Sequence, residues 1–221
     1  MGVKYNPGIV TSGLSLYLDA GSSKSYPGSG TTWYDLTNNG YNGTLTNGPT
    51  YSSGGINFVP QQYISVPYDS DINSATTFTV DMWFKSSNIG NEQVLFSTAL
   101  SGTPSTGWHI ELYQQKVILQ VYPSGSYTFS TISLNSNVVY NIAATYNSGS
   151  ISYYVNGVTA GTASYSFTPS TNILTIGVHY YTLSASLGLS GTIYSTKFYN
   201  RALSEKEVQQ NFNALRGRYG I

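Results

Sequence analysis

The run "GTIYSTKFYNRALSEKEV", residues 191–208, contains a strand pattern followed directly by the start of a helix. In its first half, side chains alternate between two kinds of position, as they do when successive residues of a strand point to opposite faces. Ser204 and Glu207 then have the spacing of a capping box, in which both side chains bind backbone N–H groups at a helix start. We therefore predict a last strand over 191–199 and one closing helix at about 204–216.

The rest of the chain has the pattern of many short strands separated by turns. Residues 13–21, "GLSLYLDAG", alternate in the same way, and residues 21–51 are too rich in Gly, Ser, Thr and Asn for a long regular element. Asn156-Gly157 suits a type I′ hairpin turn. These features favour an antiparallel sandwich or jelly roll. Further strands are expected at 56–59, 63–66, 77–85, 93–97, 108–113, 116–122, 126–132, 138–146, 150–155, 158–164 and 173–177.

Composition narrows the classes of function. The chain has 221 residues, no cysteine, a net charge of zero and only 8% charged residues. A length of this order suits one domain, and the absence of a basic surface argues against nucleic acid as a partner. We find no membrane-spanning apolar run and no secretory signal in "MGVKYNPGIVTSG" (1–13), so we expect no membrane insertion. The low charge favours tight association, and we expect an oligomeric or multicopy protein.

Three stretches resemble the laminin-G-like jelly rolls of the concanavalin A-like lectin/glucanase superfamily. They are residues 14–45, "FTVDMWFKSS" (78–87), and "ISYYVNGV" (151–158) taken with 189–208. The resemblance implies an all-β, antiparallel two-sheet jelly-roll sandwich with a short C-terminal helix. It also implies that the last strand lies beside the first and that the helix lies across the edge of the sandwich.

Residues 194 and 195 depart from the family pattern. The family often places two acidic residues after Gly-x-Ile in the last strand, whereas this chain has Tyr194 and Ser195 there. The departure removes the residues to which a metal or polar role would be assigned.

The opening run "YNPGIVTSGLSLYLDAGSSKSYPGSGTTWYDL" (5–36) is also similar to structural proteins of tailed bacteriophages. This resemblance implies a non-enzymatic structural or adhesive component of a virion, located in the capsid decoration, tail or fibre. Its partners would be other virion proteins and glycans, and its location the virion or otherwise the extracellular space. We expect residues 1–12 to form an arm that contacts a neighbouring subunit, and residues 13–221 to form the jelly-roll domain. The alternatives are a free carbohydrate-binding lectin and, less favoured, a glycoside hydrolase.

A hydrolase of the superfamily's glucanase type requires closely spaced acidic residues. The chain has nine acidic residues, and none of them forms a Glu-x-Asp-x-x-Glu pattern. His109 and Glu111 would project from one face of a strand as an acid/base or metal pair, or form an ordinary hydrogen bond beside Trp108. The only other histidine, His179, is distant in sequence. We therefore predict no catalytic site.

Asp19 and Asp35 are the candidate ligands for calcium, the one cofactor that we considered. Carboxylate and backbone oxygens bind this ion in some laminin-G-like domains. The alternative is that Asp35, in "WYDLTNNG" (33–40), caps its own turn by accepting backbone hydrogen bonds. Because calcium sites usually gather more acidic residues than this, we favour the cap and predict no metal.

Exposed aromatic residues are the candidates for binding a glycan, because the C–H face of a sugar packs on a ring while its hydroxyls form hydrogen bonds. Trp33 lies in the long early loop, Trp108 follows "SGTPSTG", and His179, Tyr180 and Tyr181 open a late loop. The alternative is that the large rings fill the core or subunit contacts. We predict a glycan-binding rim formed by Trp33, Trp108, His179, Tyr180 and Tyr181.

Overall fold

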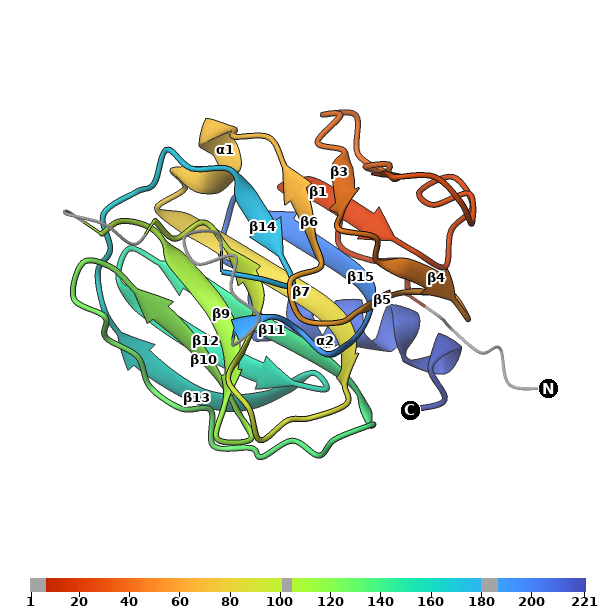
Figure 1. The fold of residues 1–221 in the computed structure, drawn as a ribbon. Coiled ribbons are helices and arrows are strands. Elements are labelled where there is room, and N and C mark those ends of the chain that lie inside the picture. Colours follow the sequence, from red (N-terminus) through yellow and green to blue (C-terminus); the bar gives the residue numbers. More distant parts are fainter. Residues whose placement is uncertain (1–6, 101–104, 180–186) are drawn as a thin grey trace.

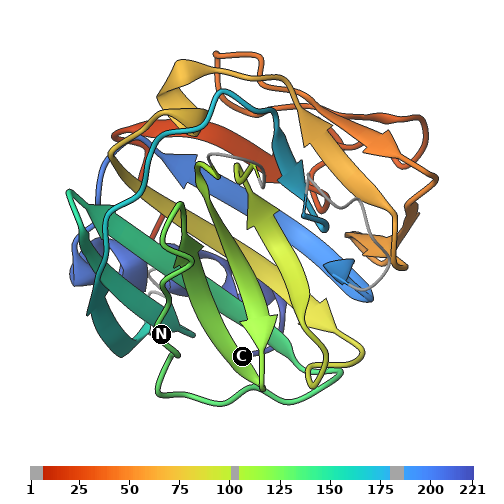
Figure 2. The same cartoon turned by 60° about the vertical axis from the view of Figure 1, so that its left-hand side comes forward.

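The structure is a computed structural model that describes residues 7–100, 105–179 and 187–221. Two antiparallel sheets lie face to face with the core between them (Figure 1), and the turned view in Figure 2 shows both layers. This is the predicted all-β jelly-roll sandwich with a short C-terminal helix. Among the described residues, no helix is long and apolar enough to cross a membrane.

The first sheet, sheet A, contains the last strand of the chain at its centre. β15 pairs with β7 on one side, and on the other side it pairs with β5 along its first part and with β1 along its second part. The predicted pairing of the first strand with the last is therefore confirmed. The order is β13-β12-β11-β7-β15-β5-β4, with β1 also beside β15. The strands are β1 (Leu14–Asp19), β4 (Thr50–Ser52), β5 (Gly55–Phe58), β7 (Thr77–Ser86), β11 (Val139–Asn147), β12 (Ser150–Val155), β13 (Val158–Ser164) and β15 (Gly191–Tyr199).

The second sheet, sheet B, has the order β10-β9-β8-β14-β6-β3-β2. Its strands are short, as the turn-rich sequence predicts. A four-residue helix, α1 (Ser70–Asn73), follows β6. The strands are β2 (Thr32–Trp33), β3 (Gly43–Thr46), β6 (Tyr63–Val66), β8 (Gln93–Ser97), β9 (Trp108–Tyr113), β10 (Lys116–Val121) and β14 (Leu174–Ile176).

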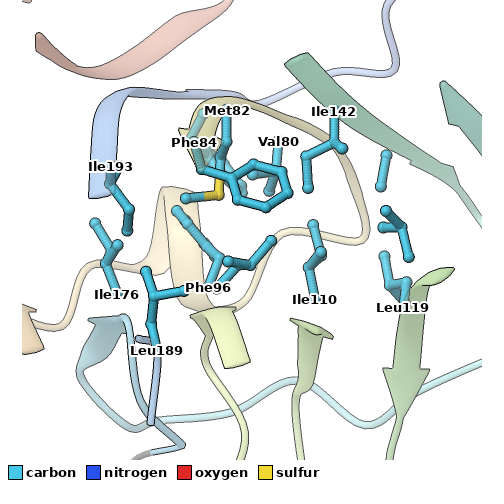
Figure 3. Close-up of a cluster of buried hydrophobic side chains, with 14 of the residues drawn as sticks. Val80, Met82, Phe84, Phe96, Ile110, Leu119, Ile142, Ile176, Leu189 and Ile193 are labelled. Carbon is cyan, nitrogen blue, oxygen red and sulfur yellow. The ribbon is translucent and has the colours of Figure 1, made fainter. Parts of the chain in front are cut away.

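The core consists of the inward-facing residues of both sheets. In β7 these are the even-numbered positions, and in β9 they are likewise residues 108, 110 and 112. Figure 3 shows side chains from β7, β11 and β15 meeting side chains from β8, β9, β10 and β14. Strict alternation thus assigns the odd-numbered residues of β7 and β9 to the outward faces of the two sheets.

The hairpin predicted at Asn156-Gly157 is confirmed, because both residues have positive φ angles (50° and 73°) as a type I′ turn requires. The strand predicted at 126–132 is wrong. That segment makes only one isolated bridge to β10, at Ser126. One further backbone bond to β10 runs from the Ser130 N–H to the Val117 carbonyl, and the N–H groups of Val117 and Leu119 donate to the hydroxyls of Ser130 and Tyr153. A continuous ladder of backbone bonds is therefore not formed.

The closing helix α2 (Glu205–Leu215) begins at the predicted capping box. Ser204 Oγ accepts from the Glu207 N–H at 3.4 Å, and the Glu207 carboxylate accepts from the Ser204 N–H at 2.9 Å. Arg201 also binds this carboxylate with two hydrogen bonds. These bonds lower the pKa of Glu207 to about 2, with the Arg201 bonds as the largest cause. A short 3₁₀ turn, η2 (Arg216–Arg218), follows the helix.

The prediction that α2 lies across the edge of the sandwich is wrong. The Phe212 ring stacks on Trp83 at 5.7 Å and 6°, and Trp83 belongs to the central strand β7. Val208 packs with Tyr154 and Tyr199 on the same outward face of sheet A. The physical reason is that the central strands carry large apolar side chains outward, and these need a cover more than the edges do.

Residues 7–12 lie along α2 of the same chain. The Gln210 side chain donates to the Gly8 carbonyl at 2.8 Å, and the Val10 N–H donates to Asn211 Oδ1 at 2.8 Å. Val10 is buried, and its carbonyl accepts from the Tyr199 hydroxyl. The described half of the predicted N-terminal arm therefore packs on its own domain, while residues 1–6 lie outside the described residues.

We expect the Ser204→Ala variant to lose about 1 kcal/mol of unfolding free energy, because the N-cap acceptor for the Glu207 N–H is removed. Arg201 still holds the Glu207 carboxylate, which keeps the loss small. Urea unfolding monitored by circular dichroism gives the difference, with Ser204→Asp as the variant that retains a cap. Equal midpoints for Ser204→Ala and wild type would show that this cap does not stabilise the fold.

Candidate functional site

Both tryptophans of the predicted glycan rim are buried in the core. Trp33 and Trp108 have no exposed surface. Trp108 occupies an inward position of β9 and stacks on Phe78 at 4.2 Å and on Phe96 at 5.6 Å. Neither ring has a surface that a sugar can reach, so the prediction that they line a glycan site is wrong. The alternative weighed from the sequence, that such rings fill the core, is confirmed for both.

His179 is also buried, and the fold brings it to His109 in spite of their separation of 70 positions in sequence. The two ring centroids are 5.0 Å apart, and the ring of Tyr122 lies 5.7 Å from that of His109. His179 therefore belongs to a buried cluster and does not form an exposed rim. The predicted residues Tyr180 and Tyr181 lie outside the described residues.

The cluster around His109 lies on the outward face of sheet B. His109 Nε2 is 3.5 Å from Glu111 Oε2, and each residue is only 2% exposed. Both ring nitrogens of His109 and this oxygen of Glu111 have no hydrogen-bond partner. The pair is therefore within ion-pair distance but does not form the ordinary hydrogen bond considered above. Among the residues described, no three His, Asp or Glu side chains converge closely enough to hold a metal ion.

Burial and neighbouring charges shift the pKa values of two side chains in or beside this cluster. Burial lowers the pKa of His179 to about 4, and the nearby His109 acts in the same direction. Glu92 lies beside the cluster, close enough to Glu111 for their charges to interact. Partial desolvation, followed by the charge of Glu111, raises the pKa of Glu92. Glu92 also lines a pocket of about 190 Å³ together with Asn88, Asn91 and Ser190.

We expect stability to fall as the pH is lowered from about 6.5 towards 4, because unfolded His179 takes up a proton that the folded chain excludes. The largest loss from this group is about 3 kcal/mol, reached at the lower end of that interval. The raised pKa of Glu92 acts in the opposite direction. Denaturant unfolding of wild type and His179→Gln at several pH values isolates the histidine. Parallel stability curves for the two proteins would contradict this assignment.

A second feature of the outward face of sheet B is a group of aromatic rings, which we call the aromatic platform and define as Tyr113, Tyr127 and Phe129. The rings of Tyr113 and Phe129 stack at 5.7 Å, and Tyr127 meets Phe129 edge-on at 5.5 Å. Tyr127 is 37% exposed, and the other two rings are half-buried. The platform thus offers ring surface to solvent, which the two tryptophans of the predicted rim do not.

Hydrogen bonds from neighbouring elements hold the platform in place. The Tyr165 hydroxyl donates to the Tyr127 carbonyl at 3.1 Å and bonds with Thr128 Oγ1 at 2.8 Å. The Lys116 ammonium donates to the Thr131 carbonyl. At the adjacent β9–β10 turn, Gln114 and Gln115 are exposed. Flat rings therefore lie beside uncharged amides, the combination that sugar recognition uses.

The two candidate calcium ligands have internal partners. Asp35 accepts hydrogen bonds from the backbone N–H groups of Tyr17 and Thr37. The prediction that Asp35 caps its own turn is therefore confirmed. Both carboxylate oxygens of Asp19 accept from Arg218, at 2.7 and 2.9 Å. The carboxylates that were considered for calcium are thus used inside the fold.

Comparison with known families gives one match to most of the chain. A family model described as the concanavalin A-like lectin/glucanases superfamily matches residues 58–209. No curated protein sequence matches the chain significantly. The matched segment includes β7 to β15 and therefore the whole outward cluster on β9 together with the aromatic platform.

Solved structures share the fold at low sequence identity. The Trypanosoma rangeli sialidase, solved as a covalent intermediate with 2,3-difluorosialic acid, matches with a TM-score of 0.74 and 15% identity over 96% of this chain and 36% of the sialidase. Domain 4 of AbnA, a GH43 extracellular arabinanase from Geobacillus stearothermophilus, solved with arabinotriose, has a TM-score of 0.70, 16% identity and coverages of 91% and 99%. The binding domain of Paraclostridial Mosquitocidal Protein 1 matches with a TM-score of 0.65 and 16% identity. The match covers 91% of this chain and 52% of that chain. The chain spans about a third of the sialidase's length.

Proposed function

Because the chain belongs to the concanavalin A-like lectin/glucanase superfamily, we propose that it is a non-catalytic glycan-binding domain whose ligand face is the outward face of sheet B. The observation that carries this proposal is the aromatic platform. Helix α2 covers the outward face of sheet A, whereas the rings of the platform remain partly open to solvent. The arabinotriose complex of the arabinanase domain supports a sugar ligand for this fold.

The chemistry of the platform favours a neutral sugar. Its rings offer π-faces for C–H contact, and the side chains of Gln114 and Gln115 offer both donors and acceptors for hydroxyl groups. Lys116, which follows Gln115 in sequence, is already bonded to the Thr131 carbonyl. We therefore expect binding to depend weakly on salt, because no charge needs to be neutralised in the complex.

The carboxyl groups near the cluster support a non-catalytic role. Retaining glycosidases hold two carboxyl groups about 5–5.5 Å apart, and inverting enzymes hold them about 6.5–9.5 Å apart. Glu111, in contrast, is only 2% exposed, so its carboxyl group is not open to a sugar beside Glu92. We expect no turnover of any glycan that the domain binds. Release of reducing sugar that is lost in Glu111→Gln would contradict the non-catalytic role.

The glycan proposal is tested by comparing two exposed tyrosines. We expect multimerised wild-type protein to bind glycans on an array of neutral oligosaccharides, and Tyr127→Ala to bind at least about fivefold more weakly, since stacking on one ring is worth about 1–3 kcal/mol. Tyr68, which is 44% exposed and remote from the platform in sequence, is the matched control, and Tyr68→Ala should bind as wild type does. Multimers are needed because repeated copies raise avidity by ~10²–10⁴. Equal loss in both variants, or no signal at all, would contradict this site.

We propose further that the domain is a structural and adhesive component of a tailed-phage virion, with other virion proteins as partners. The similarity of residues 5–36 to phage structural proteins and the low charge of the chain support this location. Mass spectrometry of purified particles tests it, with the intact chain expected at several copies per particle. Its absence from particles would favour the free lectin instead.

A further inference from the structure

The outward face of sheet A contains a buried pair of oppositely charged side chains beneath α2. Lys197 of β15 lies directly opposite Asp81 of β7. Lys197 Nζ is 2.9 Å from Asp81 Oδ1, and neither side chain has any exposed surface. Two charges buried in this way lose their hydration, and their attraction repays that cost only in good geometry with further hydrogen bonds.

The further hydrogen bonds are incomplete. Asn141 of β11 donates from Nδ2 to Asp81 Oδ1 at 3.2 Å and to the Met82 carbonyl at 3.2 Å. Asp81 Oδ2 and Asn141 Oδ1 are buried without a partner. The Tyr17 ring lies 5.3 Å from Lys197 Nζ. The pair is therefore held in contact at one carboxylate oxygen, while the other oxygen is bound by nothing.

This geometry places an amine against a carboxyl carbon. Because the C–O bond is about 1.2 Å long, Lys197 Nζ lies at most about 4 Å from Asp81 Cγ. Reacting atoms that are held about 3–3.5 Å apart in fixed orientation reach effective molarities of about 10⁵–10⁸ M. A proton that passes from Nζ to Oδ1 across this hydrogen bond yields a nucleophilic amine and a carboxylic acid.

We propose that Lys197 and Asp81 condense into an intramolecular amide that joins β15 covalently to β7. The lone pair of the neutral Lys197 Nζ forms a bond to Asp81 Cγ while the π bond to Oδ2 opens, so negative charge develops on Oδ2. The Asn141 N–H that already points to Oδ1 holds this oxygen in position as the leaving group. Oδ1 then leaves as water with the proton that it took from Nζ and a second proton from Nζ, while the charge on Oδ2 returns to form the amide carbonyl. No oxidant, metal or other reactant is needed.

The product resolves the electrostatic problem of the site. A neutral amide replaces two buried charges, so the desolvation cost of the ion pair disappears. The cross-link would join residues 116 positions apart and tie the last strand to the centre of sheet A. It would lie under α2 and so be shielded from the water that would reverse the reaction.

The test is the mass of the intact, folded full-length chain. We expect it to be lower than the mass calculated from the sequence by one water molecule, after the N-terminal residue has been identified. A digest should contain one branched peptide that joins the segments of Asp81 and Lys197. Lys116→Met, which removes a lysine outside the pair, should still lose water. The double variant D81L/K197M, which replaces the pair with apolar side chains, should have its full calculated mass.

The rate of the reaction tests the role of Asn141. Protein isolated unfolded and then folded for the first time should lose water with time, and N141A should do so at least about tenfold more slowly, because Asn141 positions the leaving oxygen. A full calculated mass after prolonged incubation of folded wild type would overturn the proposal and leave an ion pair. Loss of ammonia, with a branched peptide that contains Asn141, would overturn the assignment to Asp81.

Discussion

The Trp108→Ala variant is expected to lose about 3–5 kcal/mol of unfolding free energy, as deletion of a fully buried tryptophan does. Its ring has no exposed surface and stacks on Phe78 and Phe96, with Phe198 further away at 6.4 Å. Removal of the indole leaves a cavity between the two sheets that surrounding rings fill only in part. Urea unfolding followed by circular dichroism measures the change as a lower midpoint.

The matched control for this variant is Tyr127→Ala on the aromatic platform. Because Tyr127 is partly exposed, its truncation should change stability by about 0.5 kcal/mol or less while it weakens glycan binding. Trp108→Ala thus tests the packing of the core through stability, and Tyr127→Ala tests the ligand face through glycan binding. A Trp108→Ala protein with wild-type stability and lost glycan binding would show that the ring is a ligand residue after all.

Phe212→Ala is expected to lose about 3–5 kcal/mol, towards the lower end because the side chain retains 8% exposure. Its ring stacks on Trp83 and closes the space above the Asn156-Gly157 turn, where the ring atoms approach the position of a Gly157 Cβ to 3.0 Å. Without this ring, α2 loses its main contact with β7. Denaturant melts give the midpoint, and a change of intrinsic fluorescence reports the exposure of Trp83.

Gln209→Ala is the control at an exposed position of the same helix. Gln209 is exposed and bonds only to the Glu205 side chain, so its loss should be within about 0.5 kcal/mol. If Phe212→Ala and Gln209→Ala unfold at the same midpoint, α2 does not dock on sheet A as described here.

Local patterns in the sequence were sufficient for much of the fold. The alternation in 191–199 and the capping pair Ser204 and Glu207 depend on neighbouring residues, so the last strand and the helix start were predicted correctly. The position of α2 depends on which face of sheet A has apolar side chains outward. Because that property is set by the pairing of strands distant in sequence, it could not be read from the helix itself.

The candidate site was harder to predict for the same reason. His109 and His179 meet only because sheet pairing brings β9 and β14 to either side of β8. Trp108 was assigned to a loop rim although its alternation with His109 and Ile110 in "WHIELY" also fits an inward position of a strand. The platform did leave a signal, since Tyr127 and Phe129 are two residues apart in "SYTFS" (126–130). Tyr113 lies on β9, away from these two residues in sequence, so their local spacing does not show that it joins them.

Both described ends of the chain pack on the side of sheet A that α2 covers, so the domain has two different sides. Gly8 bonds to Gln210, and Tyr219 stacks on Trp83 at 4.4 Å, so both ends lie on the side of sheet A (Figure 1). The aromatic platform lies on the opposite side, on sheet B. A larger assembly attached at either end would therefore contact the sheet A side of the domain. Many copies attached in this way would expose the aromatic platform on the opposite side in a common orientation.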